Sequence, residues 1–255
     1  MRLVLKLETK GQNELIPINY QYEISAWIYK LIHFGNPEFA DWLHAHGFMN
    51  KNKQFKMFTF SNLKDFRYKQ RGDRLQILSN EVSLLVSFYS TEIMDPFISG
   101  IFQEQEFSIG DKISSAKFYV KSVEKLPEPQ FKEKMKFRLI SPVHLIQKNP
   151  FNENKTDHLN PFHKDFEKLF ISNLIEKYNA YNEVRDFDVT NFNLKILSEP
   201  VQRLIKIKAD KPSETKLTGY LFEFELNSTP ELNKIGFYAG FGKSNSLGFG
   251  CGEVV

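Results

Sequence analysis

Cysteine is nearly absent from this chain of 255 residues, which contains one, Cys251. One thiol cannot form an internal disulfide, and the sequence has neither the Cys-x-x-Cys pairs nor the His-rich spacing of a zinc site. It also lacks the run of about 18 apolar residues that a membrane-spanning helix requires. The first eight residues, Met1–Glu8, are too charged for a signal peptide. We therefore expect a soluble cytoplasmic protein that holds no metal ion or other cofactor and does not enter a membrane.

Excess positive charge is small overall but concentrated in one segment. The net charge is +3 and the pI is near 8.7, which is too weak a balance to identify a nucleic-acid binder. Between Lys51 and Arg74, however, there are eight basic residues and two acidic ones, so this segment carries +6. Aromatic side chains are interleaved with these cations: Phe55, Phe58, Phe60, Phe66 and Tyr68. The segment predicts phosphate contacts through Arg67, Lys69 and Arg71, with base stacking on the rings. An ordinary solvated face is the alternative.

Glycine is concentrated at the C-terminal end, where six of the thirteen glycines fall within the last twenty residues. Glycine allows a backbone to approach a ligand closely, and the backbone amides of such a loop can bind an anion. Among the glycines lie one cation and three short hydrogen-bonding side chains: Lys243, Ser244, Asn245 and Ser246. The pattern predicts a phosphate-binding loop, with a loose tail as the alternative. Leu247, Phe249 and Val254 alternate as in a buried strand, which argues against a loose tail.

The first half of the chain shows the element order β-α-β-β-α-β. Residues 2–8 alternate as a strand, and an apolar stripe predicts a helix over 20–33. Asn36 and Pro37 are typical of the cap and the first residue of a second helix, which ends at Gly47. The other expected elements are strands at 55–61, 75–79 and 82–88, a helix at 91–104 and a strand at 112–124. This is the ferredoxin-like order.

The second half shows a looser version of the same order. Pro127–Gln130 is the expected linker, because paired prolines continue neither a strand nor a helix. The expected elements are strands at 134–140, 192–198, 202–209 and 218–227, a helix at 161–178 and a helical turn at 230–234. We therefore predict an α+β fold of two tandem ferredoxin-like (βαββαβ) domains with a C-terminal glycine-rich loop. The first domain covers residues 1–126 and the second residues 131–255.

The stretch Gly-Phe-Gly-Lys-Ser-Asn-Ser-Leu-Gly-Phe-Gly at 240–250 resembles the C-terminal glycine-rich loop of the RAMP superfamily of CRISPR-associated proteins. More narrowly, it is similar to the Cas-six family, the endoribonucleases that cut CRISPR repeat RNA. The order of the glycines, the central Lys-Ser-Asn-Ser-Leu and the end-of-chain position fit together. The resemblance implies that the following residues bind RNA: Gly240, Gly242, Lys243, Ser244, Asn245, Ser246, Gly248 and Gly250.

Among six histidines, the same resemblance singles out His44. The family shows a histidine after Ala-x-x-Leu on a short helix, followed by a Phe-Thr-aromatic-Ser strand. Here Ala40 and Leu43 precede His44, and the strand pattern occurs at 58–61. The resemblance therefore implies that His44 is the catalytic histidine. His46 lies about 200° further round the helix and is the alternative.

Tyr29 occurs in Trp-Ile-Tyr-Lys-Leu-Ile at 27–32, which resembles the family's N-terminal helix carrying its catalytic tyrosine. Tyr29 lies on a helix face distinct from the core stripe. A tight turn at 35–37 between the two helices would fold that face towards His44. An ordinary half-buried aromatic is the alternative.

Lys56 directly precedes Met-Phe-Thr at 57–59, where the family's catalytic lysine lies. An exposed strand lysine without a catalytic role is the alternative. An insertion between Gly47 and Phe55 leaves the register from helix to strand open, so that Lys51 or Lys53 could take the place of Lys56.

Histidine, tyrosine and lysine without a carboxylate pair suit metal-independent RNA transesterification. The 2′-hydroxyl attacks its own 3′-phosphate, which leaves a 2′,3′-cyclic phosphate and a 5′-hydroxyl. His44 would act as general acid or base with Tyr29 as its partner, and Lys56 would stabilise the phosphorane. The alternative is a RAMP-type subunit that binds RNA within a CRISPR complex without cutting it. The expected partner is CRISPR repeat RNA, with other CRISPR-associated proteins as possible further partners. The protein is expected as a monomer or homodimer.

Overall fold

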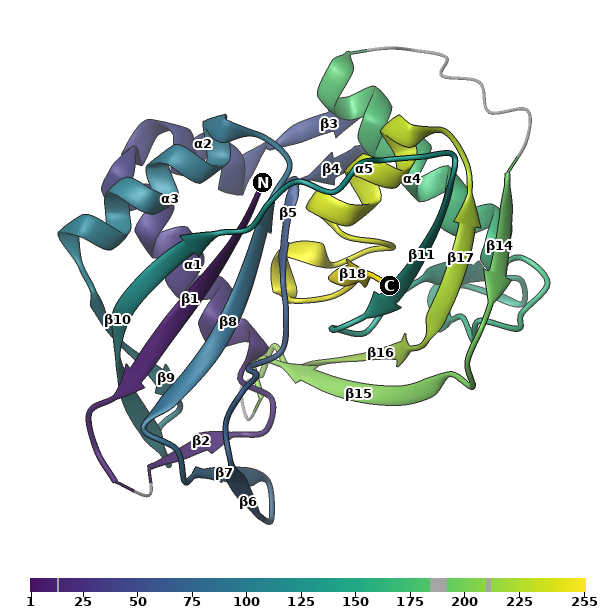
Figure 1. Ribbon diagram of the computed structural model, residues 1–255. Coiled ribbons are helices and arrows are strands. Elements are labelled where there is room, and N and C mark those ends of the chain that lie inside the picture. Colours follow the sequence, from purple (N-terminus) through teal and green to yellow (C-terminus); the bar gives the residue numbers. More distant parts are fainter. Residues whose placement is uncertain (13, 184–191, 210–211) are drawn as a thin grey trace.

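The computed structural model describes residues 1–12, 14–183, 192–209 and 212–255. Each half of the chain builds one larger antiparallel sheet, and the two sheets lie side by side with helices packed against them (Figure 1). Purple to teal colours mark the first half, and teal to yellow colours mark the second. The protein therefore has the mixed α+β architecture that the sequence predicts.

The sheet of the first half has five strands in the order β5-β8-β1-β10-β9. Their bounds are β1 Arg2–Thr9, β5 Phe58–Phe60, β8 Glu81–Phe88, β9 Glu106–Gly110 and β10 Ser115–Lys125. The apolar side chains of β1, Leu3, Leu5 and Leu7, are all buried. β1 lies in the middle of the sheet and pairs antiparallel with both β8 and β10. The strand predicted at 2–8 is therefore confirmed.

Three helices belong to this half: α1 Gln21–Gly35, α2 Pro37–Ala45 and α3 Thr91–Gln103. α1 and α3 pack closely at a glycine, because a Cβ on Gly100 would lie 2.0 Å from the carbonyl oxygen of Leu31. α2 begins where predicted, since the side chain of Asn36 accepts a hydrogen bond from the backbone N–H of Phe39 at 3.1 Å. The chain turns sharply at Asn36, so that α2 contacts α1.

The sheet of the second half has four strands in the order β14-β17-β11-β18. Its elements are β11 Lys134–Leu139, α4 Phe166–Asn182, β14 Asn193–Ile196, β17 Glu223–Asn227, α5 Pro230–Ala239, the short 3-10 helix η1 Asn245–Leu247 and β18 Gly252–Val254. Aromatic rings fill the space between this sheet and its helices. Phe241 stacks on Phe170 of α4 with centroids 5.6 Å apart and packs edge-on against Phe224 of β17 at 5.1 Å.

In the described part of the chain, short strands outside the two large sheets form a three-stranded sheet and three hairpins. The small sheet contains β2 Leu15–Pro17, β7 Arg74–Ile77 and β6 Tyr68–Arg71. The hairpins are β3 Phe48–Asn50 with β4 Lys53–Phe55, β12 Ile146–Asn149 with β13 Asn152–His158, and β15 Val201–Ile207 with β16 Thr215–Leu221. The single strand expected at 55–61 is therefore wrong. Met57 has a φ of 54°, which breaks the extended backbone between β4 and β5.

Three expectations for the second half are also wrong. The strand expected at 218–227 is two strands, β16 and β17, and β15 pairs with β16 outside the main sheet. The helical turn expected at 230–234 continues to Ala239 as α5. Leu247 and Phe249 are not part of a strand, because Leu247 ends η1 and Gly248 and Gly250 have positive φ on either side of Phe249.

The two halves are joined by buried hydrogen bonds. Arg2 of β1 is 3% exposed, donates to the carbonyl oxygen of Phe237 in α5 and lies 3.3 Å above that ring. Ser87 of β8 donates to the carbonyl oxygen of Tyr238 at 2.9 Å. The first sheet therefore carries α5 and the loop that follows it. Among the described residues, no helix has both the length and the apolar character that crossing a membrane requires.

Candidate active site and glycine-rich loop

A buried lysine holds the glycine-rich loop, residues 240–252, from beneath. Lys177 on α4 is 2% exposed, and its ammonium donates hydrogen bonds to the carbonyl oxygens of Gly240 and Gly242, the latter at 2.8 Å. Burial lowers the pKa of Lys177 well below its usual range. The lysine thus ties α4 to the backbone that follows α5.

Asn245 joins the two ends of the loop from within. Its side-chain nitrogen Nδ2 donates to the carbonyl oxygen of Phe241 at 3.0 Å and to that of Phe249 at 2.9 Å. Thr59 of β5 donates to the same Phe249 carbonyl oxygen at 2.8 Å, which fastens the loop to the first half. The loop therefore has one defined shape, and the alternative of a loose tail is wrong.

Two glycines of the loop are required by close packing. A Cβ on Gly248 would lie 2.5 Å from the ring of Phe60, and a Cβ on Gly250 would lie 1.8 Å from the carbonyl oxygen of Phe241. Several backbone N–H groups of the loop donate within the protein: those of Phe241, Lys243, Leu247, Gly248 and Gly250. Much of the polar surface of the loop is therefore formed by side chains rather than by an open cradle of amides.

A histidine pair supports the loop on another side. His144 is 2% exposed, with Nδ1 3.0 Å from the hydroxyl oxygen of Ser244 and Nε2 3.1 Å from Nδ1 of His158. Burial, together with the neighbouring His158 and Lys243, lowers the pKa of His144 to about 3. His144 is therefore neutral near pH 7 and serves to orient Ser244.

The residues predicted for catalysis lie together beside the loop. The rings of Tyr29 on α1 and His44 on α2 meet edge to face with centroids 5.5 Å apart, as the turn between the helices predicts. The Tyr29 hydroxyl lies near the side chain of Ser246. Burial raises the pKa of Tyr29 to about 12, although the neighbouring Ser246 opposes the shift. His44 is exposed, so that a substrate can reach its imidazole.

Lys56 adjoins this pair through the end of α2. Its ammonium donates to the carbonyl oxygens of Leu43 and His44, at 2.5 and 2.8 Å. Burial lowers the pKa of Lys56. An ammonium has three hydrogens, so one remains for a substrate. His46, the alternative histidine, is the exposed C-cap of α2.

The insertion after α2 forms the β3–β4 hairpin, which gives the other two lysines different surroundings. Lys53 of β4 forms an ion pair with Glu176 of α4. Lys51 is exposed at the hairpin turn with a φ of 53°. The hairpin therefore ties the first half to α4, and Lys56 is the lysine that contacts the end of α2.

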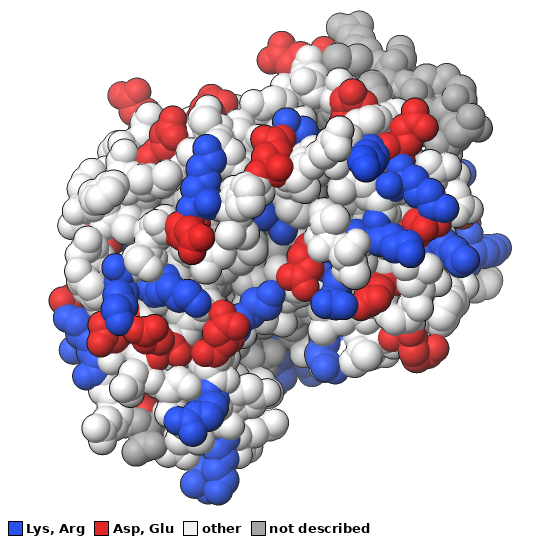
Figure 2. Space-filling model, viewed as in Figure 1, with Lys and Arg blue, Asp and Glu red and all other residues white. Residues whose placement is uncertain are grey.

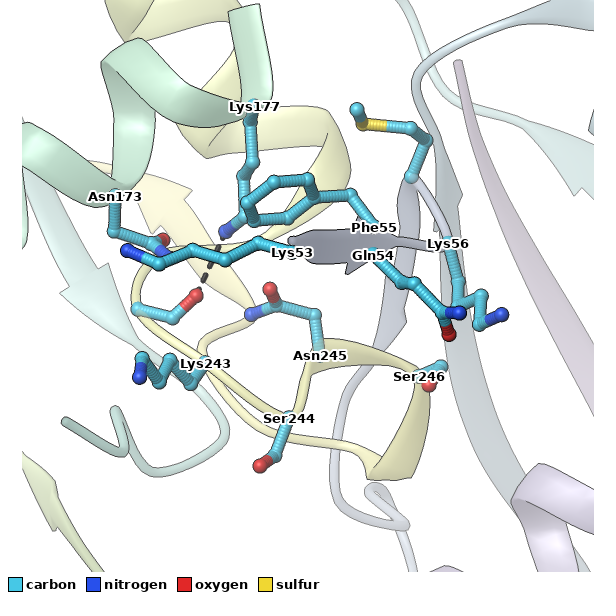
Figure 3. Close-up of a pocket in the computed structure, with 12 residues that line it drawn as sticks. Lys53, Gln54, Phe55, Lys56, Asn173, Lys177, Lys243, Ser244, Asn245 and Ser246 are labelled. Carbon is cyan, nitrogen blue, oxygen red and sulfur yellow. Dashed lines mark hydrogen bonds between the residues drawn. The ribbon is translucent and has the colours of Figure 1, made fainter. Parts of the chain in front are cut away.

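A pocket of about 360 Å³ lies between β4, α4 and the glycine-rich loop (Figure 3). It is lined by Lys53, Gln54, Phe55, Lys56, Met57, Asn173, Lys177, Gly242, Lys243, Ser244, Asn245 and Ser246. Burial, and next the nearby Lys53, lowers the pKa of Lys243. Lys56 and Ser246 contact the Tyr29–His44 pair and also line the pocket. The pocket therefore adjoins the catalytic candidates.

The three cations predicted to contact phosphates lie elsewhere. Arg67, Lys69 and Arg71 are exposed on or beside β6, at the tip that projects below the first sheet in Figure 1. Figure 2 shows basic side chains at this tip, with acidic ones interspersed on the face above it. The segment from Lys51 to Arg74 does not form one basic face, because Arg74 is buried and paired with Asp111.

The aromatic side chains of this segment differ in whether a base could reach them. Phe58 and Phe60 are fully buried in the core, whereas Phe55 is 9% exposed and lines the pocket. Tyr68 is 54% exposed and contacts Phe66 at a centroid distance of 5.2 Å. The predicted stacking surface is therefore wrong for Phe58 and Phe60, because β5 turns both rings inward.

Sequence reasoning missed Lys177 and His144. Lys177 has a recognisable signal, since it continues the apolar stripe of Phe166, Phe170 and Leu174 at helical spacing. A lysine on a buried helix face needs a polar partner, and the loop carbonyls provide it. His144 has no comparable local signal, because its partner Ser244 is 100 residues away in the chain.

Two family models match almost the whole chain. CRISPR-associated protein Cas6, N-terminal, matches residues 15–124, and CRISPR associated protein Cas6, C-terminal, matches residues 126–254. The chain belongs to the Cas6 family. A curated relative, CRISPR-associated endoribonuclease Cas6 1 of Methanocaldococcus jannaschii, is 31% identical over 98% of this chain and 91% of its own length. CRISPR-associated endoribonuclease Cas6 of Pyrococcus furiosus is 26% identical over 100% of this chain and 90% of its own length.

Solved structures show that the Cas6 likeness extends over the whole fold. A Cas6-related protein from Pyrococcus furiosus is 25% identical with a TM-score of 0.84, covering 100% of this chain and 98% of its own. Another structure, described as CRISPR associated protein Cas6, is 28% identical with a TM-score of 0.76, covering 100% and 99%. The Cas6 arrangement of the two halves is therefore shared along the full length of this chain.

Proposed function

We propose that this Cas6 family member is an endoribonuclease that cuts CRISPR repeat transcripts. The observation that carries the proposal is the contact between Tyr29 and His44 beside Ser246 of the glycine-rich loop. An imidazole, a hydroxyl donor and a phosphate-binding surface within reach of one nucleotide can together catalyse RNA cleavage of this kind. Family membership supports the same activity, since curated relatives are named CRISPR-associated endoribonucleases.

In the proposed reaction the 2′-hydroxyl before the cut attacks its own 3′-phosphate. The bond from the 2′-oxygen to phosphorus forms, and the bond from phosphorus to the 5′-oxygen breaks. His44 takes the proton of the 2′-hydroxyl, and Tyr29, which its raised pKa keeps protonated, gives a proton to the leaving 5′-oxygen. Lys56 directs its remaining N–H at the phosphorane. The products are a 2′,3′-cyclic phosphate and a 5′-hydroxyl, and no step requires a metal ion.

The same proposal assigns the two halves to tandem ferredoxin-like domains, residues 1–126 and 131–255. Each large sheet supports this, because β5-β8-β1-β10 and β14-β17-β11-β18 both have the order second, third, first and fourth strand of a β-α-β-β-α-β unit. RNA contacts the glycine-rich loop and the exposed cations beside β6. The enzyme acts in the cytoplasm as a monomer or homodimer, alone or together with other CRISPR-associated proteins.

Incubation of the protein with labelled repeat RNA in EDTA tests the proposal. We expect cleavage that leaves a cyclic phosphate, and no cleavage when the nucleotide before the cut carries a 2′-deoxy sugar, although that RNA still binds. Cleavage of the deoxy RNA would contradict transesterification, and a requirement for added Mg²⁺ would contradict metal independence. Tight binding of the unmodified repeat without cleavage would identify a non-catalytic RNA-binding subunit instead.

A further inference from the structure

The pocket beneath the glycine-rich loop contains a hydrogen-bond acceptor whose direction is fixed. Both hydrogens of the Asn245 side-chain nitrogen are donated to loop carbonyls, at 3.0 and 2.9 Å. The side-chain oxygen must therefore point the other way, and Figure 3 shows it directed into the pocket below the ring of Phe55. A rotation of the amide would set its oxygen against two carbonyl oxygens, so that this orientation is secure.

The opposite walls supply an apolar surface and unsatisfied polar groups. The ring of Phe55 forms part of the lining. Asn173 is 4% exposed, and its side-chain oxygen has no hydrogen-bond partner among the described residues. Lys177 donates hydrogen bonds to two loop carbonyl oxygens. An aromatic ring combined with fixed donors and acceptors is the usual means of binding an unpaired nucleobase.

The rim of the pocket carries charge suited to the phosphate of the same nucleotide. Lys243 lines the pocket, and the neighbouring carboxylate of Glu176 is already paired with Lys53. The phosphodiester of an RNA backbone does not account for the interior, because it has no hydrogen to donate to the Asn245 oxygen and gains nothing from the Phe55 ring. The combination favours a whole nucleotide over a bare anion.

We propose that this pocket receives the base of one unpaired nucleotide of the RNA, directly next to the cut, with Asn245 accepting a hydrogen bond from that base. The proposal rests on the proposed function for the identity of its ligand as RNA. The volume of about 360 Å³ is within the range of small-molecule sites. The nucleotide lies beside the scissile phosphate because Lys56 and Ser246 belong both to the pocket and to the Tyr29–His44 cluster.

An abasic scan of the repeat RNA tests the proposal. Each nucleotide in turn is replaced by an abasic one, and the dissociation constant is measured for the unmodified protein and for Phe55→Leu. We expect one position next to the cut where loss of the base weakens binding about tenfold or more, the effect of losing one stacked base. Phe55→Leu should bind the intact RNA more weakly but lose little further at that position. Lys69→Ala is the control, and it should weaken binding alike for every RNA.

A base analogue refines the assignment of Asn245. At the sensitive position, the natural base is replaced by an analogue that lacks the hydrogen-bond donor on its Watson–Crick edge. RNA with this analogue should bind several-fold more weakly than RNA with the natural base. A thermal melt of Phe55→Leu tests whether the variant is folded. If the variant is unfolded, the scan with the unmodified protein alone decides the proposal.

Three results would overturn the proposal: a scan with equal losses at all positions, a sensitive position far from the cut, or equal sensitivity in the unmodified protein and folded Phe55→Leu. Cleavage of the intact repeat in EDTA is measured in the same series. Cleavage with a flat scan would reject the base pocket and leave the proposed function standing. A sharp scan without cleavage would reject the nuclease and leave the pocket standing.

Discussion

In the first half of the chain, Lys56 donates to the last carbonyl oxygens of α2, and in the second half Lys177 donates to two carbonyl oxygens just beyond α5. A cation at the C-terminal end of a helix satisfies unpaired carbonyls and interacts favourably with the helix dipole. The two lysines differ in burial. Lys56 is partly exposed beside His44, whereas Lys177 is 2% exposed beneath the glycine-rich loop.

This difference separates the two roles that a lysine can have in one pocket. If Lys56 is replaced, water can reach the freed carbonyl oxygens of α2. The main loss is then the hydrogen bond that Lys56 donates to the substrate. If Lys177 is removed, the carbonyls of Gly240 and Gly242 remain buried without a donor, which costs stability. We therefore expect the residues around Lys56 to govern the cleavage rate and those around Lys177 to govern the shape of the RNA-binding loop.

His44→Ala is the variant with the largest expected effect. Loss of a general acid–base group should lower the single-turnover cleavage rate roughly a hundredfold to ten-thousandfold. The RNA dissociation constant should change little, because a neutral imidazole contributes little to phosphate binding. His46→Ala is the matched control and should cleave normally. The reverse outcome, with normal cleavage by His44→Ala and loss in His46→Ala, would move the acid–base role to the helix cap.

Lys56→Met tests the first member of the lysine pair. Loss of one donor to the transition state should lower the cleavage rate about a hundredfold. The melting temperature should stay close to that of the unmodified protein, because Lys56 is partly exposed where it contacts the end of α2. A large fall in the melting temperature with an unchanged rate in the remaining folded protein would make Lys56 a structural residue like Lys177.

Much of the first half could be predicted because its signals are local. The alternation of β1, the apolar stripe of α1 and the cap at Asn36 each depend on neighbours within a few residues. The approach of Tyr29 to His44 also follows from a short turn between two helices. The resemblance of the glycine-rich loop to the Cas6 family depends on consecutive residues, 240–250, which can be read directly from the sequence.

The rest could not be predicted because it depends on partners far apart in the chain. Lys177 and Gly240 are 63 residues apart, and the inward turn of Phe58 and Phe60 depends on pairing with β8. The break at Met57 is a backbone feature with no marker in its residue type. Periodicity identifies which face of a helix or strand is apolar. It does not identify the hydrogen-bond partner of a polar side chain on that face, such as Lys177 on α4.

Lys177→Met tests the second member of the pair. Two buried carbonyl oxygens would lose their donor, so the free energy of unfolding should fall by about 1–3 kcal/mol. RNA affinity should fall about tenfold, because the loop loses its support, and the cleavage rate at saturating RNA should change less than in Lys56→Met. Lys168→Met, an exposed lysine on the same helix, is the control for unfolding. An unchanged free energy of unfolding in Lys177→Met would contradict the structural role assigned to Lys177.

The smallest effect is expected for the exposed cations beside β6. They test whether residues of the first half also contribute to RNA binding. Arg67→Ala, Lys69→Ala and Arg71→Ala combined should reduce the salt dependence of RNA binding by about 2 in log–log slope, since each single-strand phosphate contact contributes roughly 0.7. Affinity should fall alike for repeat and unrelated RNA, because phosphate contacts carry no sequence information. Lys132→Ala, an exposed lysine in the second half, should leave the slope unchanged. Cleavage at saturating RNA should also stay unchanged, because these side chains lie away from His44. If the loss were confined to the repeat, the cations beside β6 would contact bases, and sequence recognition would extend beyond the pocket beneath the loop.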